Sequence, residues 1–544
     1  MKILSYLFTI CLALTSVAKA QENTAALMPL PNLIKTSSTN NKLDIRSATS
    51  FHYNAQTLDF AASQLSKVLQ QRLQLQLSAE LNTRSASNLA VQLLLDPSIQ
   101  GAEHYILDIT EKQLSIKGST PASVLYGVYT LDQLLLGDAA ATQQKLITPI
   151  FIDDSPLFPL RSLMLDPARH FIPVEDVKKY IDQMAKYKFN VLQLHLTDDQ
   201  GWRIEIKSHP KLTQIGAFRK PKEKATAGDN GFYSQEQIKD LVAYAAKRNV
   251  EIIPEIDVPG HTVAMLTAYP DLRCDFQKDA VFDIDSTEHK MLSAANPKVY
   301  SLLDDVLKEI SSLFPSKKIH LGGDESDIAL NWAKSPEHQA LMKKLGYNQP
   351  EQLMHYFFNK VLAAAKKYNL HTILWCELDN VRMPANKYLF DYPQHVTLVS
   401  WRNGLTPKCI ELTGIHQNAL ILAPGEYCYL DYPQYSDDFP EKGNWGMPIT
   451  TLEKTQSFRP LYDLPKDKTD HIIGIMGTIW GEAVRDINRA NYMTWPRGLA
   501  LSEAAWTKQE LRGWDSFKKR MYPNILELMK NGTSVRAPFE IVSK

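Results

Sequence analysis

Two adjacent carboxylic acids, Asp324 and Glu325, lie in the heptapeptide HLGGDES, directly after two glycines and a short apolar run. Carboxyl groups act in enzymes as general acids, general bases and stabilisers of developing charge. Adjacent like charges repel, so a pair at this position suggests a division of tasks. Neighbouring side chains in extended chain point in different directions, so the two acids could serve two atoms of one substrate. We expect the two glycines to keep the approach to the pair open.

Polar and aromatic residues also follow other short apolar runs, each of which we expect to be a strand. These residues are Asp166, Arg169 and His170; Thr197, Asp198, Asp199, Gln200 and Trp202; Glu255, Asp257 and His261; Trp375; Trp401; Tyr429 and Asp431; and Trp480 and Glu482. A single Asp after a strand is about as often a helix N-cap, and a single Trp is usually core. Aromatic rings stack on the apolar faces of sugar rings, however, and carboxylates and Arg bond the ring hydroxyls. The collection therefore favours a carbohydrate pocket.

A metal centre is the alternative interpretation of the same residues. His195, Asp198, His261, His320 and Asp324 are all of types that bind metal ions. The sequence has no HxH or HExxH spacing, and His320 precedes the expected end of its strand. We therefore expect neither a metal nor a cofactor, and loss of activity with a chelator would contradict this expectation.

The elements that must position these residues alternate along the chain. We expect strands at 161–166, 190–196, 250–256, 318–323, 372–376, 396–401, 419–423 and 472–479, with helices between most of them, for example at 174–188, 234–248 and 297–314. This α/β pattern is typical of a (β/α)8 TIM barrel, in which active sites lie at the carboxyl ends of the strands. A doubly wound open sheet is less favoured because no Gly-rich phosphate turn follows the first strand.

The barrel pattern divides the chain into domains. We assign residues 156–510 to the barrel. Residues 21–155 combine helical periodicity at 58–73 and 123–136 with strand-like runs, which predicts a smaller α+β domain. Residues 511–544 contain a helical pattern, and we expect this extension to pack on the barrel.

Residues 1–20, MKILSYLFTICLALTSVAKA, have the features of a secretory signal peptide: a positive start, an apolar run and a small-residue site before Gln21. The apolar run is shorter than the roughly 20 residues that span a bilayer. We therefore expect a secreted or periplasmic protein without a membrane anchor. Four cysteines would remain, Cys274, Cys376, Cys409 and Cys428, and the pairing of any disulfide is left open.

The composition excludes some classes of partner. Lys and Arg total 60, as do Asp and Glu, and hydrophobic residues make up 44% of the 544 residues. No basic excess points to nucleic acid. The oligomeric state is not indicated.

Several stretches together resemble the β-N-acetylhexosaminidases of glycoside hydrolase family 20. They are residues 161–206, 231–261, IHLGGDE at 319–325, YLDYP at 429–433 and GTIWGE at 477–482. The resemblance covers most of the chain and implies an α+β domain before a barrel. It also implies an exo-acting enzyme that removes terminal β-linked N-acetylglucosamine, and N-acetylgalactosamine as well, from an oligosaccharide or glycoconjugate.

The family's mechanism assigns separate tasks to the acid pair. The substrate's acetamido oxygen is the nucleophile, and it forms an oxazolinium intermediate with retention of configuration. By resemblance, Glu325 is the general acid and then the general base, while Asp324 orients the acetamido N–H and balances its charge. Tyr429 donates to the acetamido oxygen, and Asp198 with His261 supports Glu325 electrostatically.

The resemblance also implies substrate-binding residues. Arg169 would bond O3 and O4 of the sugar, and Asp431 and Glu482 would bond O4 and O6. The walls of the acetamido pocket would be Trp375, Trp401 and Trp480. We expect Trp202 and Glu255 to be structural. Ser326, Cys376 and Pro167 depart from the residues common in the family, and the alignment of Trp445 is uncertain.

Two other functions remain as alternatives. A glycan-binding protein on an inactive barrel is disfavoured by the intact set of Arg169, Asp324, Glu325 and Tyr429. A family member that releases disaccharides would need a pocket that is open beyond O4 of the sugar. Asp431 and Glu482 are expected at that side and argue for a closed pocket that holds a single sugar. Preference between the two N-acetylhexosamines and the identity of the natural glycan are left open.

Overall fold

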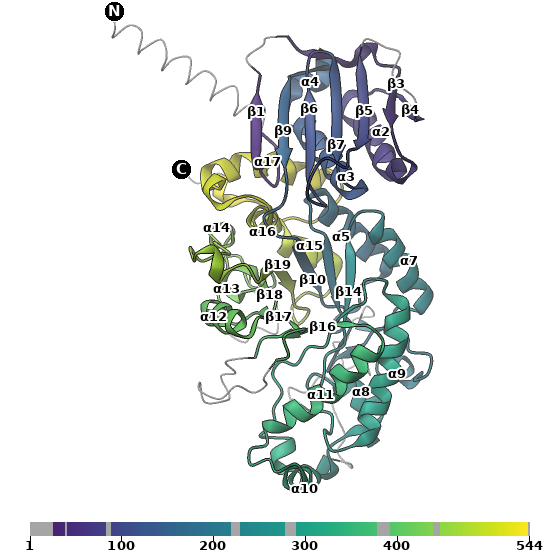
Figure 1. Ribbon diagram of the computed structural model, residues 1–544, viewed down its shortest axis with the longest axis vertical. Helices are drawn as coiled ribbons and strands as arrows, with labels where there is room; N and C mark the ends of the chain where they lie inside the picture. The colour runs from purple at the N-terminus through teal and green to yellow at the C-terminus, as the bar shows by residue number, and fades with distance from the viewer. Residues whose placement is uncertain are drawn as a thin grey trace, which may run out of the picture.

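The structure, a computed structural model, describes residues 25–37, 41–82, 89–218, 229–277, 290–377, 392–438 and 447–541. The expected signal peptide and Trp445 lie outside these residues. Figure 1 shows the N-terminal domain at one end of the molecule and the barrel below it.

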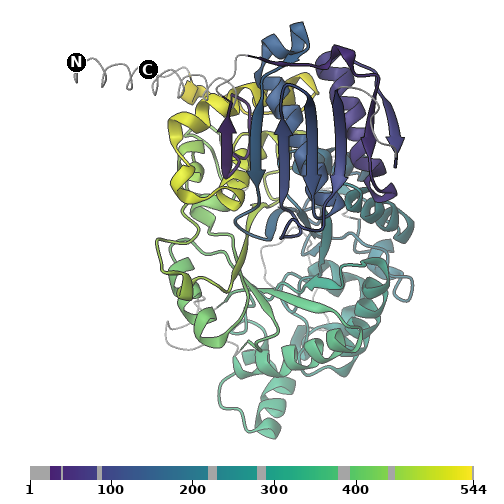
Figure 2. The ribbon, with the colours of Figure 1, turned by 45° about the horizontal axis from the view of Figure 1, so that its top comes forward.

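The N-terminal domain is built on one sheet with the strand order β1-β9-β6-β7-β5-β3-β4. Its strands are β1 (Leu33–Thr36), β3 (Ser50–Tyr53), β4 (Ser78–Leu81), β5 (Ala90–Leu95), β6 (Tyr105–Ile109), β7 (Gln113–Gly118) and β9 (Ile150–Asp154). Helices α2 (Asp59–Leu73) and α3 (Pro121–Gly137) cover one face of this sheet, as Figure 2 shows, and bury its apolar side chains. A short ribbon of β2 (Leu43–Asp44) and β8 (Leu146–Ile147), with α4 (Ala139–Gln144), completes the part described.

A closed barrel of parallel strands follows, which confirms the predicted (β/α)8 fold. The strands are β10 (Leu160–Leu165), β11 (Val191–His195), β14 (Glu251–Glu255), β15 (Lys318–His320), β16 (His371–Trp375), β17 (Thr397–Ser400), β18 (Leu420–Leu422) and β19 (Ile472–Ile479). Strand β10 pairs with both β11 and β19 and so closes the ring. Strand β15 ends at His320, three residues before the predicted end at 323, because Gly322 and Gly323 have φ angles of 63° and 94°.

Amphipathic helices surround the barrel and bury their apolar faces against it. Those longer than one turn are α5 (Val174–Lys186), α7 (Gln235–Ala246), α8 (Val263–Ala268), α9 (Pro297–Leu313), α10 (Pro336–Leu345), α11 (Gln352–Lys367), α12 (Thr406–His416), α14 (Leu452–Gln456), α15 (Ile487–Thr494) and α16 (Arg497–Trp506). Ser234 and Gln237 form a capping box that begins α7, as the sequence pattern there favours. Within the described ranges, no helix is long and apolar enough to cross a membrane.

The N-terminal domain lies at the amino ends of the barrel strands. The Glu103 carboxylate, from the N-terminal domain, accepts hydrogen bonds from Arg161 at 2.7 and 2.8 Å, from Asn190 at 3.0 Å and from Asn249 at 3.2 Å. Arg161 lies in β10. Asn190 directly precedes β11, and Asn249 lies two residues before β14. The carboxyl ends of the strands therefore face away from this domain.

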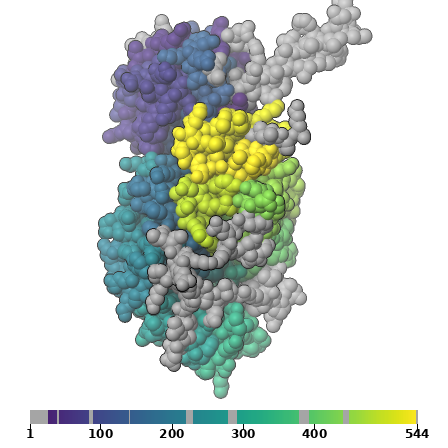
Figure 3. Space-filling view, turned by 180° about the vertical axis from the view of Figure 1, so that it is seen from behind, coloured from purple at the N-terminus to yellow at the C-terminus, as the bar shows by residue number. Residues whose placement is uncertain are grey.

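The last helix, α17 (Trp514–Lys530), joins both domains. Arg520 pairs with Glu503 of α16 at 2.6 Å, and Glu527 pairs with Arg72 of α2 at 2.7 Å. Figure 3 shows these C-terminal segments in yellow beside the N-terminal domain in purple. The extension thus packs on the N-terminal domain as well as on the barrel.

Candidate active site

The predicted site residues converge at the carboxyl ends of the barrel strands. They come from the segments that follow β10, β11, β14, β15, β17, β18 and β19, and from the last residue of β16. Only the four-residue helix α13 (Gly425–Cys428), before Tyr429 and Asp431, interrupts these segments in the described chain, which explains why strand-end position identified the functional side chains. All of the predicted residues lie in the described part of the chain.

The acid pair combines one enclosed and one open carboxyl group. The Asp324 side chain is 10% exposed and that of Glu325 is 38% exposed. Glu325 has a φ of 46°, so the expectation of extended chain through the pair is wrong at this residue. The left-handed backbone, not strand alternation, turns the two carboxyls to different surroundings.

The glycines before the pair have a different role from the expected one. A Cβ on Gly322 would lie 1.7 Å from Oδ1 of Asp257, so only glycine allows this close approach. The backbone N–H of Gly323 donates to the same oxygen at 3.2 Å. The two glycines therefore dock the turn onto Asp257, which fixes where Asp324 lies.

His261 lies between Asp198 and the acid pair. Its Nδ1 is 3.2 Å from Asp198 Oδ1, while its Nε2 is 3.7 Å from Asp324 Oδ2 and 3.8 Å from Glu325 Oε2. Burial lowers the pKa of His261, but the Asp198 and Asp324 carboxylates outweigh this and hold the pKa well above its usual value. His261 is therefore a cation that faces both acids.

Asp324 has an environment that opposes its ionisation and a neighbour that assists it. Burial raises the pKa of Asp324, and Glu325 and Glu255 raise it further, while His261 lowers it. A hydrogen bond from Asp257 also lowers the pKa of Asp324. Burial and the Asp324 charge hold the pKa of Asp257 well above its usual range. Asp257 is thus the protonated partner, and it leaves Asp324 as the carboxylate.

Arg169 is enclosed by carboxylates. Its NH2 is 2.8 Å from Asp198 Oδ2 and 3.8 Å from Glu482 Oε1, and its NH1 is 3.0 Å from Asp166 Oδ2. The guanidinium carbon also lies 5.2 Å from the centre of the Trp480 ring. This fork is held in place before any ligand binds, as recognition of hydroxyl groups requires.

Aromatic rings form the walls beside these charges. The rings of Trp401 and Tyr429 are nearly parallel, at 7°, with centroids 6.5 Å apart. The ring centroid of Trp480 lies 5.6 Å from that of Trp375 and 6.2 Å from that of Tyr429. A flat group stacked between two rings needs about 3.5 Å on each side, so none fits face to face between Trp401 and Tyr429, and the two rings form neighbouring walls. Asp324 lies within electrostatic reach of Tyr429.

Two carboxyl groups stand on the far side of the aromatic residues. Asp431 is 2% exposed, and its Oδ1 has no hydrogen-bond partner among the residues the structure describes. Burial and the nearby Glu482 hold the pKa of Asp431 well above its usual range. Desolvation also raises the pKa of Glu482, against the effect of Arg169. An acceptor with an unused oxygen in a pocket wall suits a ligand hydroxyl.

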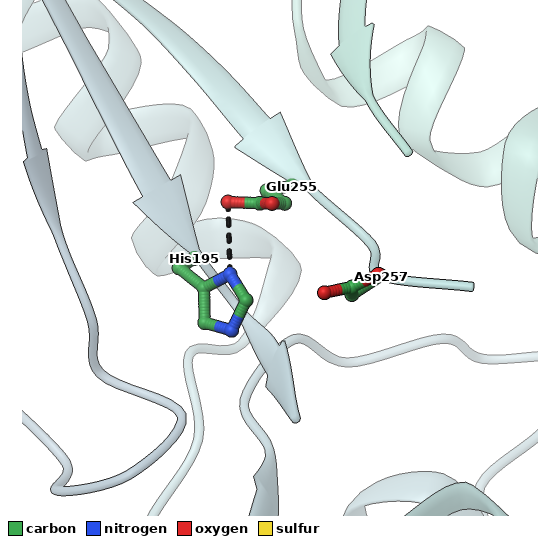
Figure 4. A group of neighbouring side chains, drawn as sticks. All are labelled: His195, Glu255 and Asp257. Atoms are coloured by element: carbon green, nitrogen blue, oxygen red, sulfur yellow. Dashed lines mark ion pairs between the residues drawn. The ribbon is translucent and has the colours of Figure 1, made fainter. Parts of the chain in front are cut away.

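A network of charges lies beneath the pocket. Figure 4 shows His195, Glu255 and Asp257, with Nδ1 of His195 at 2.8 Å from Glu255 Oε2. The other ring nitrogen of His195 is 2.7 Å from Asp198 Oδ2. Burial lowers the pKa of His195, but Glu255 and the nearby aspartates hold it well above its usual value. Carboxylates thus face both ring nitrogens of His195.

The residues of the metal interpretation therefore fit a different task. His195, Glu255 and Asp257 lie close enough to form a ligand set, as do Asp198, Asp257 and His261. In each set, however, the histidine nitrogens already face carboxylates that compensate an imidazolium. The donor chemistry favours a proton-rich hydrogen-bond network over a metal centre.

Glu255 has more contacts than the structural role expected for it. It is fully buried, and it accepts from Trp375 Nε1 at 2.8 Å and from Gln193 at 2.8 Å. His320 Nδ1 lies 3.0 Å from Oε1 of Glu255. Glu255 therefore sets the orientation of Trp375. Trp202, by contrast, is buried and donates to the Ile204 carbonyl oxygen.

Sequence reasoning missed the roles of two residues. Asp257 was noted only as a strand-end residue, and Glu377 was not identified. Glu377 is 4% exposed and accepts from Trp401 Nε1 at 3.0 Å. Its spacing, two residues after Trp375, was the available signal. Burial raises the pKa of Glu377 to about 8, although Arg402 opposes this.

The residues that depart from the family pattern lie close to the site. Ser326 Oγ is 3.5 Å from the backbone oxygen of Asp324. Cys376 Sγ is 3.5 Å from Cys409 Sγ, and both side chains are buried. Neither contact changes a charged group of the pocket.

Family profiles match both domains. "Glycosyl hydrolase family 20, catalytic domain" matches residues 158–509, and "Glycosyl hydrolase family 20, domain 2" matches residues 24–155. The first match alone covers more than half of the chain.

Curated proteins and solved structures agree with these profiles. A "Beta-hexosaminidase" of Akkermansia muciniphila is 35% identical, over 81% of this chain and 87% of that protein. A "Beta-hexosaminidase" of Porphyromonas gingivalis is 30% identical, over 99% of this chain and 69% of that protein. The structure of a Vibrio harveyi "GH20 Exo beta-N-Acetylglucosaminidase" in complex with N-acetylglucosamine has a TM-score of 0.81 and 31% identity, over 95% of this chain and 79% of that one.

Proposed function

The chain belongs to glycosyl hydrolase family 20 and is a β-hexosaminidase, and we propose that it acts as an exo-enzyme by a substrate-assisted mechanism. Its proposed substrates carry a terminal β-linked N-acetylglucosamine or N-acetylgalactosamine. The observation that carries the proposal is the division of the acid pair, with Glu325 open to the pocket and Asp324 enclosed near Tyr429.

In the first proposed step, Glu325 gives its proton to the glycosidic oxygen as the bond to the anomeric carbon breaks. The acetamido oxygen attacks that carbon and forms an oxazolinium ring, and the leaving sugar departs as an alcohol. Asp324 accepts a hydrogen bond from the acetamido N–H and balances the positive charge that develops there. Tyr429 donates to the acetamido oxygen and keeps it aligned for attack.

In the second proposed step, the Glu325 carboxylate takes a proton from water. The resulting hydroxyl attacks the anomeric carbon from the face that the leaving group vacated, and the oxazolinium ring opens. Two inversions give net retention of configuration. Glu325 ends protonated, ready for the next cycle, and no enzyme nucleophile is needed.

The exo action is supported by the residues at the opposite side of the pocket. Arg169 presents a fixed guanidinium beside Glu482, and Glu482 in turn lies near Asp431. These groups suit O3, O4 and O6 of a terminal sugar. Carboxyl acceptors and guanidinium donors together can bond O4 in the orientation of either N-acetylglucosamine or N-acetylgalactosamine.

The test is hydrolysis of 4-nitrophenyl N-acetyl-β-glucosaminide and the matching galactosaminide. We expect turnover of both by the wild type and a loss of about 10³-fold for Glu325→Gln, since general acid–base catalysis contributes about 10²–10⁴-fold. Asp324→Asn should lose a similar factor, and a thiazoline analogue of the intermediate should inhibit. Wild-type turnover by Glu325→Gln would contradict the mechanism, and binding of chitobiose without turnover would indicate a glycan-binding protein.

We further propose that the protein is exported to the periplasm or the medium and acts on chitin fragments or other glycans there. The support is the signal-like composition of residues 1–20. Cell fractionation with sequencing of the mature amino terminus tests the idea. We expect a terminus at Gln21 outside the cytoplasm, and an uncleaved cytoplasmic protein would contradict it.

A further inference from the structure

A third carboxyl group, that of Glu377, stands behind the aromatic wall of the pocket. Glu377 follows β16 by two residues and is 4% exposed. Its Oε1 accepts the indole N–H of Trp401 at 3.0 Å, and its Oε2 pairs with Arg402 NH2 at 3.0 Å. The carboxylate thus contacts two consecutive residues of the segment after β17.

The second partner of Glu377 also contacts Trp401. The Arg402 guanidinium carbon lies 4.0 Å from the centre of the Trp401 ring, within the range of a cation–π contact. Glu377 therefore fixes the indole edge directly, through its hydrogen bond. It also fixes Arg402, which packs on the indole ring. One carboxylate holds the ring in its plane by both contacts.

The plane of Trp401 matters because Tyr429 lies parallel to it. Their centroids are 6.5 Å apart, less than the about 7 Å that a group stacked between them would need, so Trp401 and Tyr429 bound the acyl space as neighbouring walls. A tilt or retreat of Trp401 would widen the acyl space at the wall that Trp401 forms. The position of Trp401 therefore sets how long or thick an acyl group the space accepts.

We propose that Glu377 is a positioning residue that sets the N-acyl specificity of the enzyme through Trp401. The proposal rests on the proposed function, in which Trp401 is one wall of the acetamido pocket and Tyr429 bonds the acetamido oxygen. The carboxylate does not touch the sugar. It restricts Trp401, so that an N-acetyl group fits and the additional methylene of an N-propionyl group does not.

If Glu377 had a merely structural role, its loss would change the kinetics in a different way. Loss of a buried partner for Arg402 would lower the fraction of folded enzyme and so lower the activity on every substrate by one factor. A change in the width of the acyl space alters the ratio between substrates. The ratio of kcat/KM for N-acetyl and N-propionyl substrates is therefore the informative quantity.

The experiment compares 4-nitrophenyl β-glucosaminides that carry N-acetyl, N-propionyl and N-butanoyl groups. In the wild type we expect each added methylene to lower kcat/KM about tenfold or more, as in other close-fitting apolar pockets. In Glu377→Ala we expect the acetyl-to-propionyl ratio to fall at least about threefold and KM for the N-acetyl substrate to rise. Glu377→Gln should keep the wild-type ratio within about twofold, because its amide oxygen still accepts the Trp401 N–H.

Trp401→Phe, which lacks the N–H, should change the ratio in the same direction as Glu377→Ala, and the double variant should change it no further. Glu503→Gln is the matched control: it alters a buried carboxyl partner of an arginine, Arg520, but lies far from the strand ends that carry the pocket. We expect an unchanged ratio for it.

An unchanged ratio in both Glu377→Ala and Trp401→Phe would overturn the inference. If Glu377→Ala does not fold, the outcome for Trp401→Phe and Glu377→Gln decides it. Failure of the proposed function has a separate signature, since the wild type would then hydrolyse none of the three substrates.

Discussion

At the scale of single residues, the pocket is organised by alternation of charge. The His261 cation separates Asp198 from the acid pair, and the Arg169 cation separates Asp198 from Glu482. Each buried acid thereby faces a cation or a protonated neighbour, which is the condition under which charges persist in a buried site. For Asp199, burial and Asp198 outweigh the nearby cations.

Burial and one charged neighbour, Asp198, oppose the ionisation of Asp199, while His261 and Arg169 favour it. Burial and the adjacent Asp198 raise its pKa from 3.8 to about 6, although it accepts the backbone N–H of Val263 at the start of α8. Its folded-state pKa exceeds its unfolded-state pKa, so ionisation destabilises the folded protein above pH 6. That cost disappears as the pH falls through the folded pKa towards 4.

We therefore expect Asp199→Asn to be more stable than the wild type above pH 6, by up to about 3 kcal/mol. The asparagine removes the charge and keeps the acceptor for Val263. Thermal unfolding at pH 7.5 and at pH 4.5 measures the difference, which should shrink at the lower pH. A variant less stable than the wild type at pH 7.5 would refute this account of Asp199.

At the scale of elements, much of the architecture follows from sequence patterns. Apolar runs of strand length between amphipathic helices predicted all the barrel strands, because a parallel strand buried on both faces is apolar throughout. Positions directly after these strands identified the groups at the mouth. The end of β15 was misplaced because HLGG looks like a strand, while its glycines adopt positive φ to meet Asp257.

Contacts between distant segments could not be predicted in this way. Asp257 and Glu377 acquire their roles from Asp324 and Trp401, which lie on other strands' loops. In the N-terminal domain, β1 pairs with β9 across more than a hundred residues, and both strands are too short for a clear alternation of polar and apolar residues. Such pairings are set by tertiary packing rather than by local pattern.

The turn after β15 provides a test of the element that carries the acid pair. Gly322→Ala would place a methyl group against Asp257 and force an alanine to a φ of 63°. We expect activity to fall by about 100-fold or more, since small displacements of catalytic groups have effects of that size. Hydrolysis of the N-acetyl substrate and thermal unfolding measure the two effects.

Gly346→Ala is the matched control for this variant. Gly346 ends α10 with a φ of 71°, but a Cβ there would have no atom within 4 Å. It introduces the backbone strain without the clash, so we expect a stability loss of about 1 kcal/mol and normal turnover. Equal losses of activity in both variants would show that strain, not contact with Asp257, controls the turn.

At the scale of the whole molecule, the partly buried carboxylate of Glu103 joins the two domains. Glu103 pairs with Arg161 of β10 and accepts from Asn190 and Asn249 at the amino ends of the neighbouring strands. Helix α17 adds a second connection through Glu527 and Arg72. We infer that the domains unfold together.

Glu103→Ala should therefore destabilise the molecule by about 3 kcal/mol or more, because it leaves Arg161 buried without its counter-charge. Calorimetry should show one transition for the wild type and a lower or divided transition for the variant. Glu175→Ala, which removes an exposed partner of Lys178, should change the transition little. A wild-type profile for Glu103→Ala would show that the domains do not depend on this contact.

The position of the N-terminal domain at the amino ends of the barrel strands has a practical consequence. The domain contacts the amino ends of barrel strands, opposite the end that carries Glu325, so a support attached to it would not obstruct the pocket. An enzyme immobilised through the outer side of the N-terminal sheet would present its opening to the surrounding liquid. Bulky glycoconjugates could then reach the bound enzyme as freely as small aryl glycosides do.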